Sequence, residues 1–142
     1  MVGAAEARAP GGRLPVTGYV LVFLGAGIGG TLRHAVNVGA ARVTGSAFPW
    51  GTLTVNVVGS FAMGLVAGWL ALKAGEGWSQ QARLLLATGV LGGFTTFSAF
   101  SLDVVVLWER NEALSALAYG AGSVVLSVGG LVAGLAVIRA VT

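Results

Sequence analysis

The chain contains no cysteine, a single histidine and very few charged residues. Only 9% of its 142 residues are Asp, Glu, Lys or Arg, whereas an ordinary soluble domain carries about 25% charged residues. The absence of cysteine excludes a disulfide framework and thiolate metal sites, and His34 has no second histidine with which to share a metal ion. Because so few charges could not cover a water-facing surface, the composition indicates a membrane protein.

Charge and motifs argue against nucleic-acid binding and against catalysis. The net charge is +3, but the basic residues are scattered singly and form no stripe that could follow a phosphate backbone. The glycine-rich run at residues 25–30 superficially resembles a dinucleotide fingerprint, yet it lies inside an apolar segment. No nucleophile and base occur in a recognisable arrangement. We therefore expect neither a nucleic-acid partner nor an enzymatic activity.

Apolar residues are abundant, making up 56% of the chain, with a mean hydropathy of +0.88. Four apolar segments reach or exceed the roughly 20 residues of a membrane-spanning helix: Tyr19–Ala41, Thr52–Leu72, Ala82–Trp108 and Ala113–Arg139. We predict an all-α membrane protein in which residues 1–17 form a flexible N-terminal tail and residues 18–142 form a single four-helix transmembrane domain.

The third segment is interrupted near its middle by Gly92–Phe100, which reads GGFTTFSAF. Two adjacent glycines and three hydroxyl side chains are thereby placed near the centre of a membrane crossing. A backbone that leaves helical geometry in hydrocarbon is tolerated only where it is buried in protein or lines a pathway. Discontinuous helices at the midplane commonly hold ions, so we predict a broken helix that forms a conduit or an ion site.

Small residues recur at four-residue spacing, for example at Gly25 and Gly29 and at Gly130 and Gly134, and this spacing predicts close helix packing. Four short helices enclose little interior, so oligomerisation is the natural way to complete a pathway. The distribution of Lys and Arg between the two expected sides of the bilayer is only weakly biased. Positive-inside reasoning therefore permits insertion in both orientations and an antiparallel dimer.

Two polar residues within the apolar segments allow alternative interpretations. Asn56 lies in the second segment, where an amide must be hydrogen-bonded to be tolerated; it either ties two helices together or donates its NH₂ group to a passing anion. Arg33, near the end of the first segment, either draws anions into a vestibule or extends its charged end to the membrane interface.

Two further patterns suggest a lined route. Tyr119, Ser123 and Ser127 recur every four residues and share one helix face, which favours a polar track over hydroxyls that bond back to their own helix. Phe97 and Phe100 also share a face. An aromatic pair usually serves packing, but the positive ring edge can interact with an anion, and this pair directly follows the interruption.

Together these stretches resemble the Fluc (CrcB) family of bacterial fluoride channels over nearly the whole of residues 24–139. The resemblance rests on residues 25–34, on FPWGT at 48–52 continuing to NVVGSF at 56–61, and on residues 92–100. Three positions depart from the family pattern: Ala26 replaces a common Gly, His34 stands where Tyr is usual, and Ala99 replaces a frequent Thr.

The resemblance implies an antiparallel, dual-topology homodimer in the bacterial inner membrane, with two pores that export cytoplasmic fluoride and confer fluoride resistance. It also implies a structural sodium ion at the dimer centre. Expected partners are fluoride, the lipid bilayer and a second copy of the chain. By resemblance, the fluoride pathway comprises Thr52, Asn56, Phe97, Ser98, Phe100, Tyr119, Ser123 and Ser127, Arg33 stands near a vestibule, and the carbonyls of Gly92 and Thr95 bind sodium.

Two other classes of membrane protein fit the sequence less well. A proton-coupled exporter of the small multidrug resistance type also has four helices and dual topology, but it needs a membrane-embedded carboxylate in its first helix. Tyr19–Arg33 contains no acid. A purely structural membrane protein would not require a broken helix.

Overall fold

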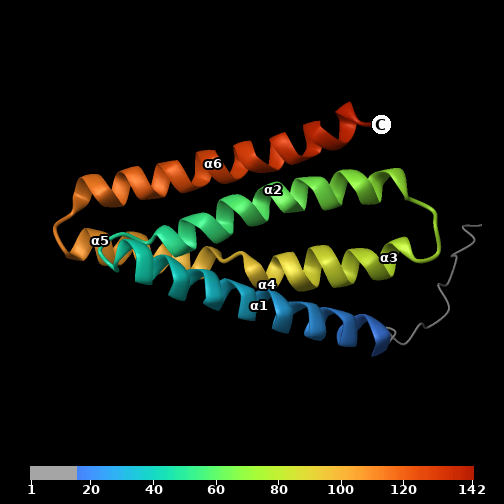
Figure 1. Ribbon diagram of the computed structural model, residues 1–142, viewed down its shortest axis with the longest axis horizontal. Helices are drawn as coiled ribbons and strands as arrows, with labels where there is room; N and C mark the ends of the chain where they lie inside the picture. Colours follow the sequence, from blue (N-terminus) through green and yellow to red (C-terminus); the bar gives the residue numbers. More distant parts are fainter. Residues whose placement is uncertain (1–15) are drawn as a thin grey trace, which may run out of the picture.

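The computed structural model describes residues 16–142, which form helices joined by short connections (Figure 1). Within residues 16–142, four helical spans are long and apolar enough to cross a membrane: Val16–Thr44, Trp50–Leu72, Ser79–Glu109 and Ala113–Ala140. The four predicted segments are therefore confirmed, each slightly extended. Of the predicted tail, residues 1–15 lie outside the described range, whereas Val16 and Thr17 begin the first helix.

Three spans are single helices, namely α1 (Val16–Thr44), α2 (Trp50–Leu72) and α6 (Ala113–Ala140). The third span consists of α3 (Ser79–Ala82), a π-helix η1 (Arg83–Leu91), α4 (Gly92–Phe94) and α5 (Phe97–Glu109). Between α4 and α5 the backbone is extended, with φ −80° and ψ 157° at Thr95 and φ −154° and ψ 120° at Thr96. The predicted break is confirmed at these two residues.

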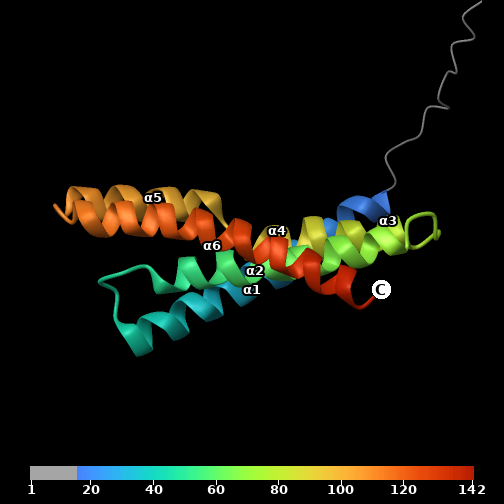
Figure 2. The same ribbon diagram turned by 90° about the horizontal axis from the view of Figure 1, so that it is seen from above.

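The third span changes its neighbours at the break. Its first half, η1 and α4, packs against α1, whereas α5 packs against α6. In Figure 2, α5 runs beside α6 while α1 and α2 diverge from them toward the same end of the molecule. The α2 helix packs extensively against α6. At the break, the third span therefore leaves its contact with α1 and begins its contact with α6.

Close backbone contacts confirm the predicted role of the small residues. A Cβ atom at Gly25 would lie 2.6 Å from the carbonyl oxygen of Leu85, and one at Gly29 would collide with the carbonyl oxygen of Val90. On the other side of the bundle, Gly134 lies equally close to the α2 backbone. Glycine is needed at these positions because no side chain fits between the helices.

Little of the single chain is buried. The core cluster comprises Leu107, Ala116 and Tyr119, against which Phe48 and Phe100 pack. Large apolar side chains are exposed along all four spans, as expected where lipid or another protein, rather than water, surrounds the helices. The small interior agrees with the prediction that one copy encloses little space.

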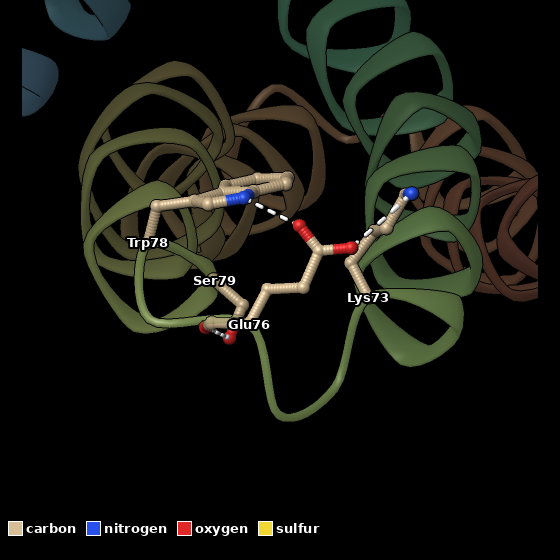
Figure 3. A network of polar contacts seen from close by, with 4 residues as sticks. All are labelled: Lys73, Glu76, Trp78 and Ser79. Carbon is tan, nitrogen blue, oxygen red and sulfur yellow. Dashed lines mark hydrogen bonds and ion pairs between the residues drawn. The ribbon is translucent and has the colours of Figure 1, made fainter.

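The connection between α2 and α3 is held by a short polar network, drawn in Figure 3. Glu76 accepts a hydrogen bond from Trp78 Nε1 at 2.5 Å and forms an ion pair with Lys73 at 3.3 Å. The ring of Trp78 lies 5.3 Å from that of Trp69. An exposed ion pair contributes little stability, so the network mainly shapes the turn, and its tryptophans occur where amphipathic rings favour the membrane interface.

Candidate ion pathway

The break in the third span is anchored by Asn56 from α2. The N–H of Thr96 donates to Asn56 Oδ1 at 2.8 Å, and Asn56 Nδ2 donates to the Thr96 carbonyl at 3.0 Å. This pair of bonds satisfies backbone groups that would otherwise be costly in hydrocarbon. Asn56 is therefore an interhelical tie. Its Nδ2 group also carries a second N–H, so the tie does not consume all of its donors.

The same interruption separates two carbonyls from their usual helical partners. In a continuous α-helix the Gly92 carbonyl would accept from the amide of residue 96, and the Thr95 carbonyl from that of residue 99. Here the Thr96 amide donates to Asn56, and the Ala99 amide donates to Thr96 Oγ1 at 3.2 Å. Both amides thus donate to side-chain oxygens. The carbonyls of Gly92 and Thr95 therefore do not accept from the amides that would bond to them in a continuous helix.

A groove of about 300 Å³ lies beside the break. It combines one amide, several hydroxyl groups and two phenyl rings with two valines, and no charged side chain lines it. The lining residues are Asn56, Ser60, Thr95, Thr96, Phe97, Phe100, Ser123, Val124, Ser127 and Val128. Three spans contribute to it, because α2 and α6 both face the junction of the third span. A groove of this composition offers hydrogen-bond donors without a fixed charge.

Phe97 and Phe100 lie together at the start of α5, with ring centroids 5.4 Å apart and planes inclined by 45°. Phe97 is 76% exposed in the single chain, which argues against a role in the core of one copy. Thr96 caps α5 through its hydroxyl oxygen. The α5 N-terminus thus points toward the groove, and the helix dipole makes this end favourable for negative charge.

The hydroxyl stripe on α6 divides into two parts. Ser123 and Ser127 line the groove, as the four-residue spacing predicts. Ser123 is 4% exposed, and its Oγ has no hydrogen-bond partner among residues 16–142. A buried hydroxyl without a partner is unusual, and here it belongs to a residue that lines the groove. Tyr119 lies one turn away in the core and donates to Asp103 Oδ2 at 3.0 Å.

A second cavity, of about 220 Å³, lies around the connection between α1 and α2. Thr52, Asp103 and Arg110 line it, as does Asn37, whose buried Oδ1 has no hydrogen-bond partner within the described residues. Thr52 therefore belongs to this cavity and not to the groove. Tyr119 contacts residues of both cavities, because its hydroxyl bonds to Asp103 and its ring lies 5.5 Å from that of Phe100.

Four of the predicted site residues line neither cavity: Arg33, Gly92, Ser98 and Tyr119. Arg33 is half-buried on α1, and Ser98 is exposed, with its Oγ 3.2 Å from Thr96 Oγ1. Sequence reasoning missed two residues that do line the second cavity, Asn37 and Arg110. A polar amide one turn after Arg33 was an available signal, but only the packing of Asn37 against Gly51 reveals where it points.

Comparison with known proteins identifies the relatives of this chain. Residues 20–135 match the family model described as CrcB-like protein, Camphor Resistance (CrcB). The chain is 54% identical to the fluoride-specific ion channel FluC of Rhodopseudomonas palustris (strain BisB5) over 124 residues. That alignment covers 87% of this chain and 98% of the relative. It is 58% identical to the fluoride-specific ion channel FluC of Hyphomonas neptunium (strain ATCC 15444) over 120 residues. That alignment covers 84% of this chain and 94% of the relative. The chain therefore belongs to the CrcB family.

Proposed function

We propose that this multi-pass membrane protein is a fluoride-selective passive channel and not an enzyme. The observation that carries the proposal is the groove beside the broken third span, in which neutral donors and two phenyl rings converge without a charged side chain. The family relationship supports the same conclusion, since the relatives at 54% and 58% identity are named fluoride-specific ion channels.

The groove suits an anion that must bind and leave again. The Asn56 amide and the Ser123 and Ser127 hydroxyls can donate hydrogen bonds to a halide, and the ring edges of Phe97 and Phe100 present partial positive charge. The N-terminus of α5 adds a favourable dipole. A full positive charge would bind the ion more tightly, whereas conduction requires weak, repeated binding.

Passive conduction is sufficient to remove fluoride from a cell. Hydrofluoric acid crosses membranes as a neutral molecule and ionises inside, so fluoride accumulates in the cytoplasm. An interior-negative potential then favours its exit by about 2.3 kcal/mol per charge per 100 mV. No proton relay is needed, and none of the residues lining the groove is acidic.

The functional unit in this proposal is an antiparallel homodimer in the bacterial inner membrane. Two observations support it: Phe97 is largely exposed in the single chain, and the groove is open along one side instead of being enclosed by its own four spans. A second copy in the opposite orientation would cover both. The weak charge bias between the two sides of the bilayer is consistent with insertion both ways.

A structural sodium ion at the dimer centre would be held by the carbonyls of Gly92 and Thr95. The residues fit the ion, because hard cations prefer oxygen ligands and both carbonyls have lost their helical amide partners to Asn56 and Thr96. Gly92 is also exposed on the single chain. When bound, sodium would supply positive charge that holds four carbonyl oxygens of two copies together.

Fluoride efflux from liposomes tests the proposed activity. Vesicles that contain the purified protein and potassium fluoride should release fluoride rapidly when valinomycin dissipates the developing voltage, and vesicles loaded with chloride should not. No release of either ion, or equal release of both, would remove the proposal of a fluoride-selective channel.

Cysteine labelling tests the dual topology independently of flux. The native chain has no cysteine, and a side chain at Gly77 would meet no atom within 4 Å, so Gly77→Cys provides a single reporter in the α2–α3 connection. An impermeant thiol reagent should label about half of the protein in intact cells and the remainder only after permeabilisation. Labelling from one side alone would contradict dual topology while leaving the flux result valid.

A further inference from the structure

Aromatic side chains form a continuous series from the α1–α2 connection to the groove. The ring of Phe48 lies 4.7 Å from that of Trp50 and 5.5 Å from that of Tyr119. Tyr119 in turn lies 5.5 Å from Phe100, which contacts Phe97 at 5.4 Å. Phe48 lines the second cavity, whereas Phe97 and Phe100 line the groove. The series thus connects the two cavities through Tyr119.

The backbone that carries Phe48 is held firmly. A residue before proline is restricted to extended conformations, and Pro49 follows Phe48 directly. The Trp50 amide donates to the Phe48 carbonyl at 2.9 Å, and the Leu53 amide donates to the Pro49 carbonyl at 3.1 Å. Phe48 is therefore fixed to the first turn of α2, although it precedes the helix.

Phe48 and Phe100 contact the Tyr119 ring in different ways. The planes of Phe48 and Tyr119 are inclined by 87°, an edge-to-face contact, whereas those of Phe100 and Tyr119 are inclined by 43°. Edge-to-face pairs have a directional preference that aliphatic contacts lack. The two contacts restrict rotation of the Tyr119 ring, and the hydroxyl group then lies at Asp103, 3.0 Å away.

We propose that Phe48 is a positioning residue for the anion pathway, which holds the Tyr119 hydroxyl at the junction of the two cavities. This inference rests on the proposed fluoride conduction. Tyr119 is 1% exposed and lies between the two cavities: its hydroxyl donates to Asp103, which lines the second cavity, and its ring packs against Phe100, which lines the groove. Without the Phe48 ring, the Tyr119 ring loses its edge-to-face contact. The ring then rotates more freely, and its hydroxyl occupies the position beside Asp103 for a smaller fraction of the time.

Aromatic and non-aromatic replacements of Phe48 test this role by fluoride efflux from liposomes. Phe48→Tyr keeps the ring and should conduct at nearly the parental rate. Phe48→Met and Phe48→Leu keep apolar bulk without a ring and should lower the flux about fivefold, the scale of one aromatic pair. Phe23→Leu is the matched control, because Phe23 is 78% exposed on α1 and takes no part in the series; it should leave the flux unchanged.

A double-mutant cycle with Tyr119→Phe separates positioning from general packing. If Phe48 acts through the Tyr119 hydroxyl, Phe48→Met should lower the flux less than twofold further once that hydroxyl is absent, because the two changes remove one interaction. Multiplicative losses, parental flux in Phe48→Met, or misfolding of every non-aromatic variant on size-exclusion chromatography would overturn the proposal. Parental protein in the same experiment reports on conduction itself, since failure of the proposed function would abolish fluoride flux there too.

Discussion

The two halves of the third span each pack against a neighbouring helix, but through different kinds of contact. The first half packs backbone against backbone: Gly25 and Gly29 of α1 lie so close to η1 that no Cβ fits between them. The second half, α5, packs through side chains, with Leu107 and Phe100 set against Tyr119 and Ala116 of α6. No side chain fits between α1 and η1 at these two glycines, whereas residues of α5 line both cavities.

The difference indicates how one span can serve both stability and conduction. Close glycine contacts give the first half its stability through van der Waals packing and allow no adjustment. Side-chain contacts in the second half leave spaces that rotamer changes can alter. Close backbone packing and the cavities thus lie in different halves of the same span, and Asn56 bonds to Thr96 at the boundary between them.

The largest effect is expected from placing a side chain in the backbone-packed half. Gly29→Val would drive its Cβ into the Val90 carbonyl and should destabilise the protein by at least about 3 kcal/mol, because an overpacked backbone contact cannot relax by a rotamer change. The protein should lose its monodisperse peak on size-exclusion chromatography. Gly27→Ala is the matched control, since its Cβ would meet nothing within 4 Å; equal behaviour of the two variants would refute backbone packing as the basis of this half.

A smaller and more selective effect is expected in the side-chain-packed half. Phe97→Ile and Phe100→Ile should each reduce fluoride flux by about tenfold or more while the protein still assembles, because isoleucine keeps apolar bulk but lacks the ring quadrupole. Phe100→Ile should also lower the melting temperature, since Phe100 packs against the core cluster and Phe97 is largely exposed. If both variants assemble and conduct at the parental rate, the two rings serve packing and not conduction.

The smallest effect concerns the residue that begins α5. Thr96→Ala removes the hydroxyl that accepts from the Ala99 amide and should cost about 1 kcal/mol, as for other helix caps. Thr96→Ser should restore most of that stability, whereas Ser98→Ala, which removes only the contact to Thr96 Oγ1, should change it little. Thermal melting in detergent measures all three. A larger loss for Ser98→Ala than for Thr96→Ala would contradict the assignment of the cap.

The sequence allowed the four spans and the position of the break to be predicted, because length, hydropathy and paired glycines are local properties. The resemblance also predicted a common route of eight residues. The structure brings five of them to one groove, namely Asn56, Phe97, Phe100, Ser123 and Ser127, whereas Thr52, Ser98 and Tyr119 do not line it. The partner of Asn56 could not be predicted, since Thr96 lies 40 residues away. The second cavity depends on how the α1–α2 connection folds back over α5, which no periodicity encodes.

The bonds between Asn56 and Thr96 have a mechanical consequence. An interruption in a helix is ordinarily its weakest point, where the chain bends and exchanges its amide protons first. Here the Thr96 amide and carbonyl are both bonded to one side chain of a neighbouring span, so the joint is clamped. We expect slow deuterium exchange at the Thr96 amide, and a third span that moves as a rigid bent rod. An ion would then advance past small rotations of side chains along a fixed frame, and not through opening of the bend.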